Sequence, residues 1–313
     1  MKNKISIVSS CYNEEDNIDE LYKQIKTEID KFEDRLNYEI ILLDNASTDG
    51  TAKKLRELAQ KDFNVKVILN ARNFGHIRSP FYGIMQASGD AIIYLASDLQ
   101  DPPELISQFI QKWIEGEKLV IEIKNKSKES FLMHCIRNLF YDILDKISDD
   151  NTVQIKNFTG FGLYDKQIID IAKSYDDPYP YFRGIISEVG FDKQIINFTQ
   201  PKRKRGKTKN NFYTLYDSAM LGITKHSKVP LRLMTFGGFV LSIFSMLIAV
   251  AYFLYKLIFW KRFALGIAPA VIGLFAFSSV QLFSLGILGE YIGAIYTRID
   301  KKPIVVEKER INF

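Results

Sequence analysis

The stretch Ala96-Ser97-Asp98-Leu99-Gln100-Asp101-Pro102-Pro103 decides how the rest of the chain is interpreted. It follows an apolar run, residues 91–95, whose length and β-branched content are typical of a buried strand. The prolines suit the first turn of a helix, so the polar residues are expected just beyond a strand's carboxyl end, where open α/β sheets bind ligands. Oxygen ligands at that place suit a hard cation such as Mg²⁺ or Mn²⁺, which in turn suits a diphosphate. A turn that merely caps the helix is the alternative.

Strands alternate with helices through the first third of the chain. Apolar runs at residues 5–10, 39–43 and 65–69 are separated by segments of helical periodicity, of which residues 17–32 are the clearest. This alternation predicts a parallel, doubly wound α/β sheet. The first strand is followed by neither a glycine-rich dinucleotide fingerprint nor a P-loop, which argues against a dehydrogenase and against an NTPase.

Polar loops are expected at three strand ends: residues 11–15, 44–51 and 96–103. Because the carboxyl ends of parallel strands share one edge of a sheet, we expect these loops to converge on one crevice. Asp44 is placed to accept hydrogen bonds from a base or ribose, while Ser47 also suits capping of the next helix. Arg72, after the third strand, would bring a positive charge to the same crevice.

The apolar residues gather near the end of the chain. Neither residues 233–255 nor residues 263–289 contain a charged side chain, and each run exceeds the roughly 20 residues that a helix needs to cross a bilayer. Residues 211–228 fit an amphipathic helix in the headgroup region. Basic residues flank the pair of spans more heavily than the turn between them, which predicts a cytoplasmic location for both termini.

The loops occur in the order seen in GT-A glycosyltransferases of family 2, and the chain most resembles the polyprenyl-phosphate glycosyltransferases. That group includes dolichol-phosphate mannose synthases and bacterial glucosyl and aminoarabinosyl relatives. The resemblance covers nearly the whole chain and is carried by residues 11–15, 44–51, 72–75, 98–103, 160–165, 182–184, 189–191, 203–209 and 286–291. It implies an α/β GT-A (Rossmann-like, doubly wound) catalytic domain and a metal-dependent, inverting hexosyltransferase.

The resemblance also implies roles for individual residues. Asp98 and Asp101 match catalytic positions, and Asp98 and Gln100 match positions that hold Mg²⁺ or Mn²⁺. The nucleotide is expected to contact Tyr12, Asn13, Glu14, Asp44, Ser47, Arg72 and Ser97. The acceptor phosphate is expected to contact Lys124, Lys128, Arg137, Arg203 and Lys209. A solvated basic helix face is the alternative for the first three of these, and attraction to anionic lipid for the last two.

Two positions depart from the family pattern. Ala96 stands where the family has the first aspartate of Asp-x-Asp, and Asn45 stands where it has a second aspartate in the earlier loop. Weaker metal binding, a changed metal preference and an inactive homologue all remain open. A lipid phosphate is already anionic near neutral pH, since its second pKa is about 6, so such an acceptor needs little help from a base. This consideration favours an active enzyme.

The sequence is therefore divided into a cytoplasmic GT-A domain (1–209), an amphipathic juxtamembrane segment (210–230), two transmembrane helices (231–258 and 265–295) and a cytoplasmic tail (296–313). The expected location is the inner (plasma) membrane. Glycines 286, 289 and 293 permit close helix approach, so a homo-oligomer, either a dimer or a tetramer, is expected. The net charge of +5 comes largely from residues 202–209, and a nucleic-acid partner is not expected.

The leading interpretation is transfer of a sugar from a nucleotide sugar, expected to be UDP-linked, to polyprenyl (undecaprenyl) phosphate on the cytoplasmic leaflet, for cell-envelope glycan modification. A non-catalytic membrane scaffold that binds nucleotide sugars is one alternative, and Ala96 is its best support. A transferase acting on a glycan hydroxyl would need a strong base. A processive synthase would need more spans than two, and a transporter would need several subunits to enclose a path.

Overall fold

A mixed sheet of eight strands organises the described part of the chain, in the order β7-β5-β6-β4-β1-β2-β3-β8. The computed structural model describes residues 2–126, 155, 158–199, 220, 223–224, 229–259, 267–299 and 302–313. The strands are β1 Asn3–Cys11, β2 Leu36–Asp44, β3 Val65–Asn70, β4 Ala91–Tyr94, β5 Leu119–Lys126, β6 Gly162–Asp165, β7 Gln194–Thr199 and β8 Glu307–Ile311. The helices are α1 Ile18–Ile29, the 3-10 turn η1 Asp30–Phe32, α2 Thr51–Lys61, α3 Gly75–Met85, α4 Leu105–Ile114, α6 Lys166–Ser174, α7 Phe182–Glu188, α9 Val229–Ile258 and α10 Ile267–Ile299.

The middle of the sheet is parallel, as the alternation of strands and helices predicts. Strand β1 pairs in parallel with β2 and β4, and β2 pairs in parallel with β3. The flanks differ from the prediction, because β6 runs antiparallel to both β4 and β5, and β8 runs antiparallel to β3. The domain is thus an α/β domain with a mixed sheet, in which the parallel strands place three loops at one edge.

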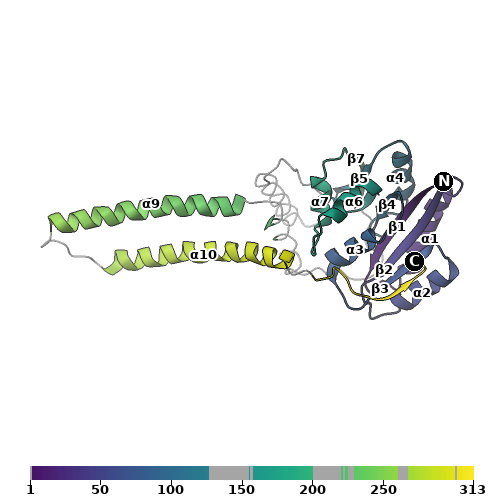
Figure 1. Cartoon of the computed structure of the whole chain (residues 1–313), viewed down its shortest axis with the longest axis horizontal. Coiled ribbons are helices and arrows are strands. Elements are labelled where there is room, and N and C mark those ends of the chain that lie inside the picture. The colour runs from purple at the N-terminus through teal and green to yellow at the C-terminus, as the bar shows by residue number, and fades with distance from the viewer. Residues whose placement is uncertain are drawn as a thin grey trace.

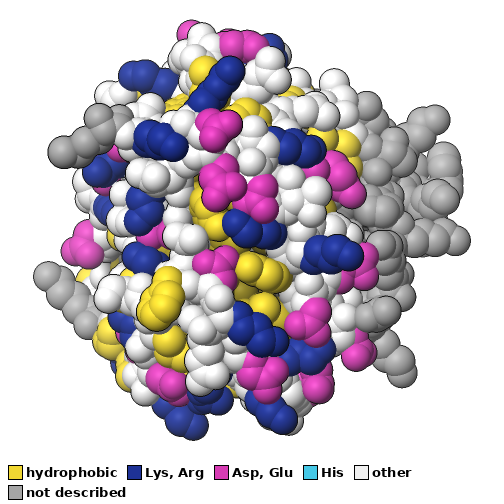
Figure 2. All heavy atoms as spheres, turned by 90° about the vertical axis from the view of Figure 1, so that its right-hand side faces the viewer, with side chains coloured by type: hydrophobic (Ala, Val, Ile, Leu, Met, Phe, Trp, Pro, Cys, Tyr) yellow, Lys and Arg dark blue, Asp and Glu magenta, His cyan; other side chains and the backbone are white. Residues whose placement is uncertain are grey.

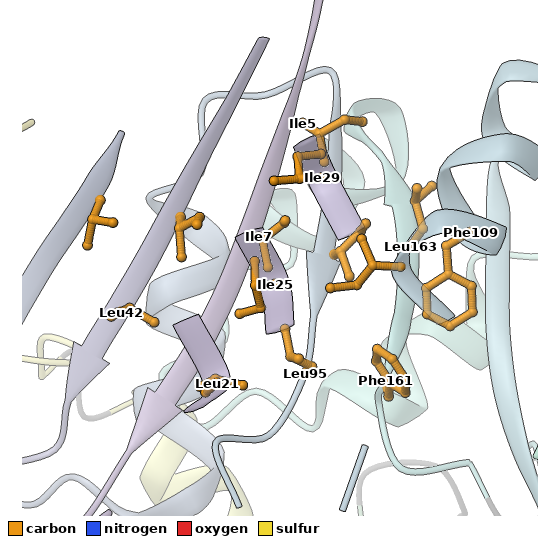
Figure 3. Close-up of a cluster of buried hydrophobic side chains, with 14 of the residues drawn as sticks. Ile5, Ile7, Leu21, Ile25, Ile29, Leu42, Leu95, Phe109, Phe161 and Leu163 are labelled. Carbon is orange, nitrogen blue, oxygen red and sulfur yellow. The ribbon is translucent and has the colours of Figure 1, made fainter. Parts of the chain in front are cut away.

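Two hydrophobic layers lie on opposite faces of the sheet. Helices α1, α2 and α4 cover one face, where Ile5 and Ile7 of β1 pack against Leu21 and Ile25 of α1. Figure 3 shows this layer, with Phe109 of α4 closing it beside Phe161 and Leu163. Helices α3, α6 and α7 cover the other face, which Val8, Ile41 and Ile92 line. Alternate residues of β1 therefore serve opposite layers.

Helices α9 and α10 form a hairpin that projects from one side of the domain (Figure 1). Both are long and apolar enough to cross a membrane, and the stretches Val229–Ile248 and Ala276–Ile299 are not buried inside the structure. Large apolar side chains such as Phe236, Leu247 and Leu282 are exposed along them. An apolar surface of that kind is typical of contact with lipid rather than water.

After α10 the chain returns to the domain and adds β8 to the edge of the sheet. Strand β8 pairs with β3, and the side-chain nitrogen of Asn312 donates to the carbonyl oxygens of Ala59 and Val65 at 2.7 and 2.9 Å. Arg56 of α2 forms an ion pair with Glu309 at 2.7 Å. The last residues of the chain are therefore part of the sheet, and they connect it directly to α10.

Candidate functional site

Loops that leave β1, β2 and β4 meet at the carboxyl edge of the parallel strands. The backbone N–H of Asn13 donates to Ser47 Oγ at 2.8 Å, and that of Thr48 donates to Asn13 Oδ1 at 2.7 Å. From the loop after β4, the Ser97 hydroxyl donates to the carbonyl oxygen of Ser10 at 3.0 Å. The loops after β1 and β2 are therefore joined to each other by hydrogen bonds, and the loop after β4 is joined to the end of β1.

The first loop carries Tyr12, Asn13 and Glu14. Asn13 lies in the left-handed region, with a φ of 55°, which an asparagine tolerates better than most residues. Glu14 is buried; its backbone N–H donates to Thr51 Oγ1 at 3.0 Å, and its Oε2 accepts from Asn17 Nδ2 at 2.6 Å. The glutamate carboxylate thus holds the start of α1, while Tyr12 is half-buried in the same loop.

Asp44 ends β2 and is almost completely buried. Its two carboxylate oxygens accept from the backbone N–H of Ser47 at 3.3 and 3.1 Å. Burial raises the pKa of Asp44 more than these hydrogen bonds lower it. The side chain therefore closes the turn after β2, at the edge of the sheet where the three loops begin.

Asn45, one of the two departures from the family pattern, joins the second loop to the start of α3. Its Nδ2 donates to Asn73 Oδ1 at 2.9 Å and to the Gly75 carbonyl at 3.2 Å. Its Oδ1 accepts from Asn70 Nδ2 at 3.0 Å and from the Phe74 N–H at 2.8 Å. An aspartate could accept the second pair but could not donate the first. The amide at this position is therefore explained by its structural contacts.

Two arginines occupy the flank of the crevice after β3. The guanidinium of Arg72 lies 4.1 Å from the ring centroid of Phe74, and that of Arg78 lies 5.3 Å from the same centroid. Burial lowers the pKa of Arg78, and the charge of Arg72 lowers it further. Arg78 Nη2 also donates to the carbonyl of Pro303 at 2.5 Å. Two neighbouring cations at this flank favour an anionic ligand, and one of them contacts the segment after α10.

The loop after β4 turns back on itself around Leu99. Leu99 is buried and has a φ of 59°, a costly conformation for a non-glycine residue that is often found at functional sites. Asp101 is buried, and its Oδ2 accepts from the Ala96 N–H at 2.9 Å. Asp98 Oδ1 accepts from the Gln100 N–H at 3.1 Å. Asp101 therefore closes the loop, and Asp98 is the less buried carboxylate of the two.

The donor set at this loop fits a divalent cation only in part. Among the residues that the structure describes, no group of three or more His, Cys, Asp and Glu side chains is placed to hold a metal. Asp98 and Gln100 offer one carboxylate and one amide, both hard oxygen donors. Mg²⁺ is commonly held by one or two carboxylates together with substrate phosphates and water. The loop is compatible with that arrangement, in which the diphosphate would complete the coordination.

Five basic residues are predicted to contact the acceptor phosphate. Lys128, Arg137, Arg203 and Lys209 lie outside the described residues. The backbone of Lys124 lies in β5, but its side chain is not described. Their roles stay predictions from the resemblance.

Comparison with known proteins identifies the family of this chain. Residues 6–170, more than half of the chain, match the glycosyl transferase family 2. The chain belongs to glycosyl transferase family 2. The matched region runs from β1 into α6 and includes all three loops of the crevice. This family 2 glycosyltransferase therefore carries its family's sequence pattern on the elements that build the crevice.

Relatives match over nearly the full length. The uncharacterised glycosyltransferase YkcC of Bacillus subtilis is 34% identical over 96% of this chain and 92% of its own length. A prophage bactoprenol glucosyl transferase homologue of Escherichia coli is 31% identical over 97% of this chain and 98% of its own. Among solved structures, glucosyl-3-phosphoglycerate synthase of Mycobacterium tuberculosis, in complex with Mn²⁺, UDP and phosphoglyceric acid, has a TM-score of 0.50 at 18% identity, over 71% and 76% of the two chains. That similarity supports the fold.

Sequence reasoning assigned no role to two features of this glycosyltransferase's crevice. One is the network around Asn45, whose partners lie 25 to 30 residues further along the chain. The other is Arg183, which lines a cavity next to Tyr94, at the end of β4. The motif formed by residues 182–184 belongs to the resemblance, so a signal for Arg183 existed, but its function could not be inferred from the sequence.

Proposed function

We propose that this family 2 glycosyltransferase transfers a hexose, with inversion, from a UDP-linked donor to polyprenyl (undecaprenyl) phosphate on the cytoplasmic leaflet of the inner membrane. The observation that carries this proposal is the combination, in one chain, of the crevice with an exposed apolar hairpin. Relatives named bactoprenol glucosyl transferases, matching 97–98% of this chain, support the choice of acceptor and of a hexose. Modification of a cell-envelope glycan is the process that such a product would serve.

The loops proposed to bind the donor nucleotide are those after β1, β2, β3 and β4. Asp44 and Ser47 would bind the base or ribose, together with Tyr12, Asn13 and Glu14, while Arg72 and Ser97 would face the diphosphate. Asp98 and Gln100 would hold the diphosphate through a divalent cation, Mg²⁺ or Mn²⁺. When bound, that cation supplies positive charge that offsets the charge of the departing diphosphate.

The transfer proposed is a single displacement. An oxygen of the acceptor phosphate forms a bond to the anomeric carbon of the hexose while the bond from that carbon to the diphosphate oxygen breaks. The products are polyprenyl-phosphate hexose and UDP, and the anomeric configuration inverts. Because the acceptor oxygen is already anionic, the chain has to supply positioning rather than a base, and the loss of a carboxylate at Ala96 is tolerable.

The orientation proposed places the hairpin in the bilayer and the domain on its cytoplasmic side. On the face of the domain that points away from the hairpin, Lys and Arg side chains alternate with Asp and Glu (Figure 2), as expected for a surface in contact with water.

Subunit association is proposed through α10. A methyl group placed on Gly286, Gly289 or Gly293 would meet no described atom within 4 Å, so this stripe leaves room for a second chain.

The proposal is tested by incubating detergent-purified protein with undecaprenyl phosphate and a panel of UDP-hexoses, with Mg²⁺ or Mn²⁺ and with a chelator. Mass spectrometry of the lipid fraction should find a hexosylated lipid, and the chelator should abolish it. Asp98→Asn should lower the rate by about 100-fold or more, whereas the exposed control Asp34→Asn should not change it. Absence of product with every donor would contradict the proposal.

A non-catalytic scaffold that binds nucleotide sugars is the second candidate, because Ala96 removes one carboxylate from the loop. It predicts UDP binding by the wild type without any turnover. Restoring the carboxylate with Ala96→Asp would then create activity in an inert protein, whereas in an enzyme the same change would only alter metal affinity or preference.

A further inference from the structure

A cavity of about 220 Å³ opens next to the loop after β4, between the first turns of α3 and α7. His76 and Phe81 of α3, Tyr94 at the end of β4 and Arg183 of α7 contribute to its walls. A methyl group placed on Gly160 would lie 3.8 Å from the Tyr94 ring and 3.9 Å from Cγ of Arg183, so these two side chains flank the same short loop. None of the roles assigned to the nucleotide loops uses this cavity.

Arg183 is the arginine that lines this cavity. Charges of both signs lie near Tyr94. Burial raises the pKa of Tyr94, the carboxylates of Asp101 and Asp98 raise it further, and the positive charge of Arg183 lowers it. Arg183 is half-buried; its guanidinium carbon lies 5.4 Å from the ring centroid of Tyr181, and its Nη1 donates a long hydrogen bond to the Phe158 carbonyl at 3.5 Å. A planar guanidinium that lines a cavity in this way has donors suited to binding an anion.

A second cavity of about 220 Å³ lies between α7 and the cytoplasmic end of α10. Ile185 from α7 and Tyr291, Ala294 and Ile295 from α10 give it apolar walls, and charged side chains also line it, namely Asp177, Glu188 and Arg298. Tyr181 lines both cavities. One side chain therefore borders both the cavity at the end of the apolar hairpin and the cavity next to the loop after β4.

We propose that Arg183 binds the phosphate of the lipid acceptor, and that the isoprene units next to this phosphate lie in the cavity between α7 and α10. The inference rests on the proposed function, because only a lipid phosphate must extend from the bilayer to the crevice. The apolar walls suit the isoprenoid, and the planar guanidinium suits the phosphate. The base and ribose are proposed to bind at the loops after β1 and β2, whereas Arg183 lines the cavity next to Tyr94, and Tyr181 connects that cavity with the one at α10. The acceptor would thus approach the anomeric carbon from the side opposite the nucleotide.

The test measures equilibrium binding of two acceptors without any donor: undecaprenyl phosphate and the short isoprenoid citronellyl phosphate. Arg183→Ala should weaken the binding of both by about 10- to 100-fold, since it removes a charge-assisted contact to phosphate that they share. Ala294→Trp, which fills the cavity at α10, should weaken the binding of both acceptors, because both carry the isoprene units next to the phosphate, and should leave the binding of inorganic phosphate unchanged. The Kd for UDP should stay within about twofold of the wild type in both variants. Arg35→Ala, an exposed arginine at the opposite edge of the sheet, is the matched control.

Three results would overturn the inference. Unchanged acceptor binding by Arg183→Ala would exclude a phosphate contact, and a loss of UDP binding would place Arg183 in the donor site. Unchanged binding of both acceptors by Ala294→Trp would exclude the isoprenoid position. If Arg183→Ala unfolds, Arg183→Lys replaces it and should weaken phosphate binding by a smaller factor, because the charge stays while the paired donors are lost. A wild type that binds both acceptors through Arg183 but forms no product would refute the proposed function and leave this inference standing.

Discussion

Replacing Asn45 by aspartate should destabilise the domain, although the family pattern has an aspartate there. The change removes the two hydrogen bonds that Asn45 Nδ2 donates to Asn73 Oδ1 and the Gly75 carbonyl, and it places a charged oxygen against those two acceptors. We expect the free energy of unfolding to fall by about 2–4 kcal/mol, measured by urea denaturation. The control is Asn37→Asp, at an exposed position in β2, the strand that Asn45 follows, and it should cost little. Equal stability of the two variants would contradict the explanation given for Asn45.

Glu39 makes the stability of the domain sensitive to acid. Although burial alone would raise the pKa of Glu39, hydrogen bonds from Lys4, Lys66 and Ser6 lower it from 4.5 to about 2. Because the folded state binds the proton more weakly than the unfolded state, the stabilisation is complete above about pH 5 and disappears as the pH falls toward about 2.

Glu39→Gln should therefore remove this pH dependence and lower the free energy of unfolding at pH 7 by about 3 kcal/mol. Denaturation curves between pH 3 and pH 7 provide the measurement. Glu33→Gln, at an exposed position, is the control and should leave the curve unchanged. A variant at Glu39 that keeps the acid sensitivity of the wild type would show that another carboxylate is responsible.

At the scale of single residues, the sequence located the crevice better than it explained its members. Asp98 and Asp44 could be placed because each follows a recognisable strand. The bonds of Asn45 could not be predicted, because they depend on where β3 and α3 lie in space. Ala96 and Asn45 looked alike as lost carboxylates in the sequence. In the structure, Asn45 has a role of its own, while Ala96 contributes its backbone N–H to Asp101.

Among the elements, β8 is the one whose deletion should lower the free energy of unfolding most clearly. Deleting residues 305–313 would expose the edge of β3, remove the buried side chain of Val305 and break the two hydrogen bonds of Asn312. We expect the free energy of unfolding to fall by about 3–5 kcal/mol.

Glu309→Gln separates this effect from that of a surface ion pair. Arg56 and Glu309 are both more than one-third exposed, so removing their pair should cost less than about 1 kcal/mol. Calorimetric unfolding in detergent measures both variants. Equal losses would mean that β8 acts through this single contact rather than through strand pairing.

The strands of the parallel region and β8 differ in how far they could be predicted. Strands β1 to β4 are apolar, and helices separate them, so each could be predicted from its own residues and those next to it. Strand β8 is mostly charged, as edge strands often are, and its partner β3 precedes it by more than 200 residues. Sequence patterns report local structure, whereas this pairing depends on the hairpin bringing the chain back to the domain.

At the scale of the whole molecule, the hairpin follows one edge strand of the sheet in the chain and precedes the other. Strand β7, the last described strand before α9, is at one end of the strand order, and β8, the first element after α10, is at the other. Arg78 adds a contact between the crevice and the segment after α10. Two attachments restrict rotation of the domain more than a single tether would, so the crevice is held at a defined position relative to the hairpin.

This arrangement predicts that removing the hairpin leaves nucleotide binding intact but slows sugar transfer to the membrane lipid. A variant with residues 229–301 replaced by a flexible linker keeps β8, so it should stay folded and bind UDP like the full chain. With citronellyl phosphate in solution it should be slower than the full chain, because the α10 wall of the cavity proposed for the isoprene units is removed. Its rate with undecaprenyl phosphate in vesicles should fall by about 100-fold, because the effective concentration that the hairpin provides is lost. A chain ending at residue 228 lacks β8 and should unfold at a lower temperature than the linker variant. Wild-type rates on vesicles for the linker variant would show that the hairpin does not position the domain over its acceptor.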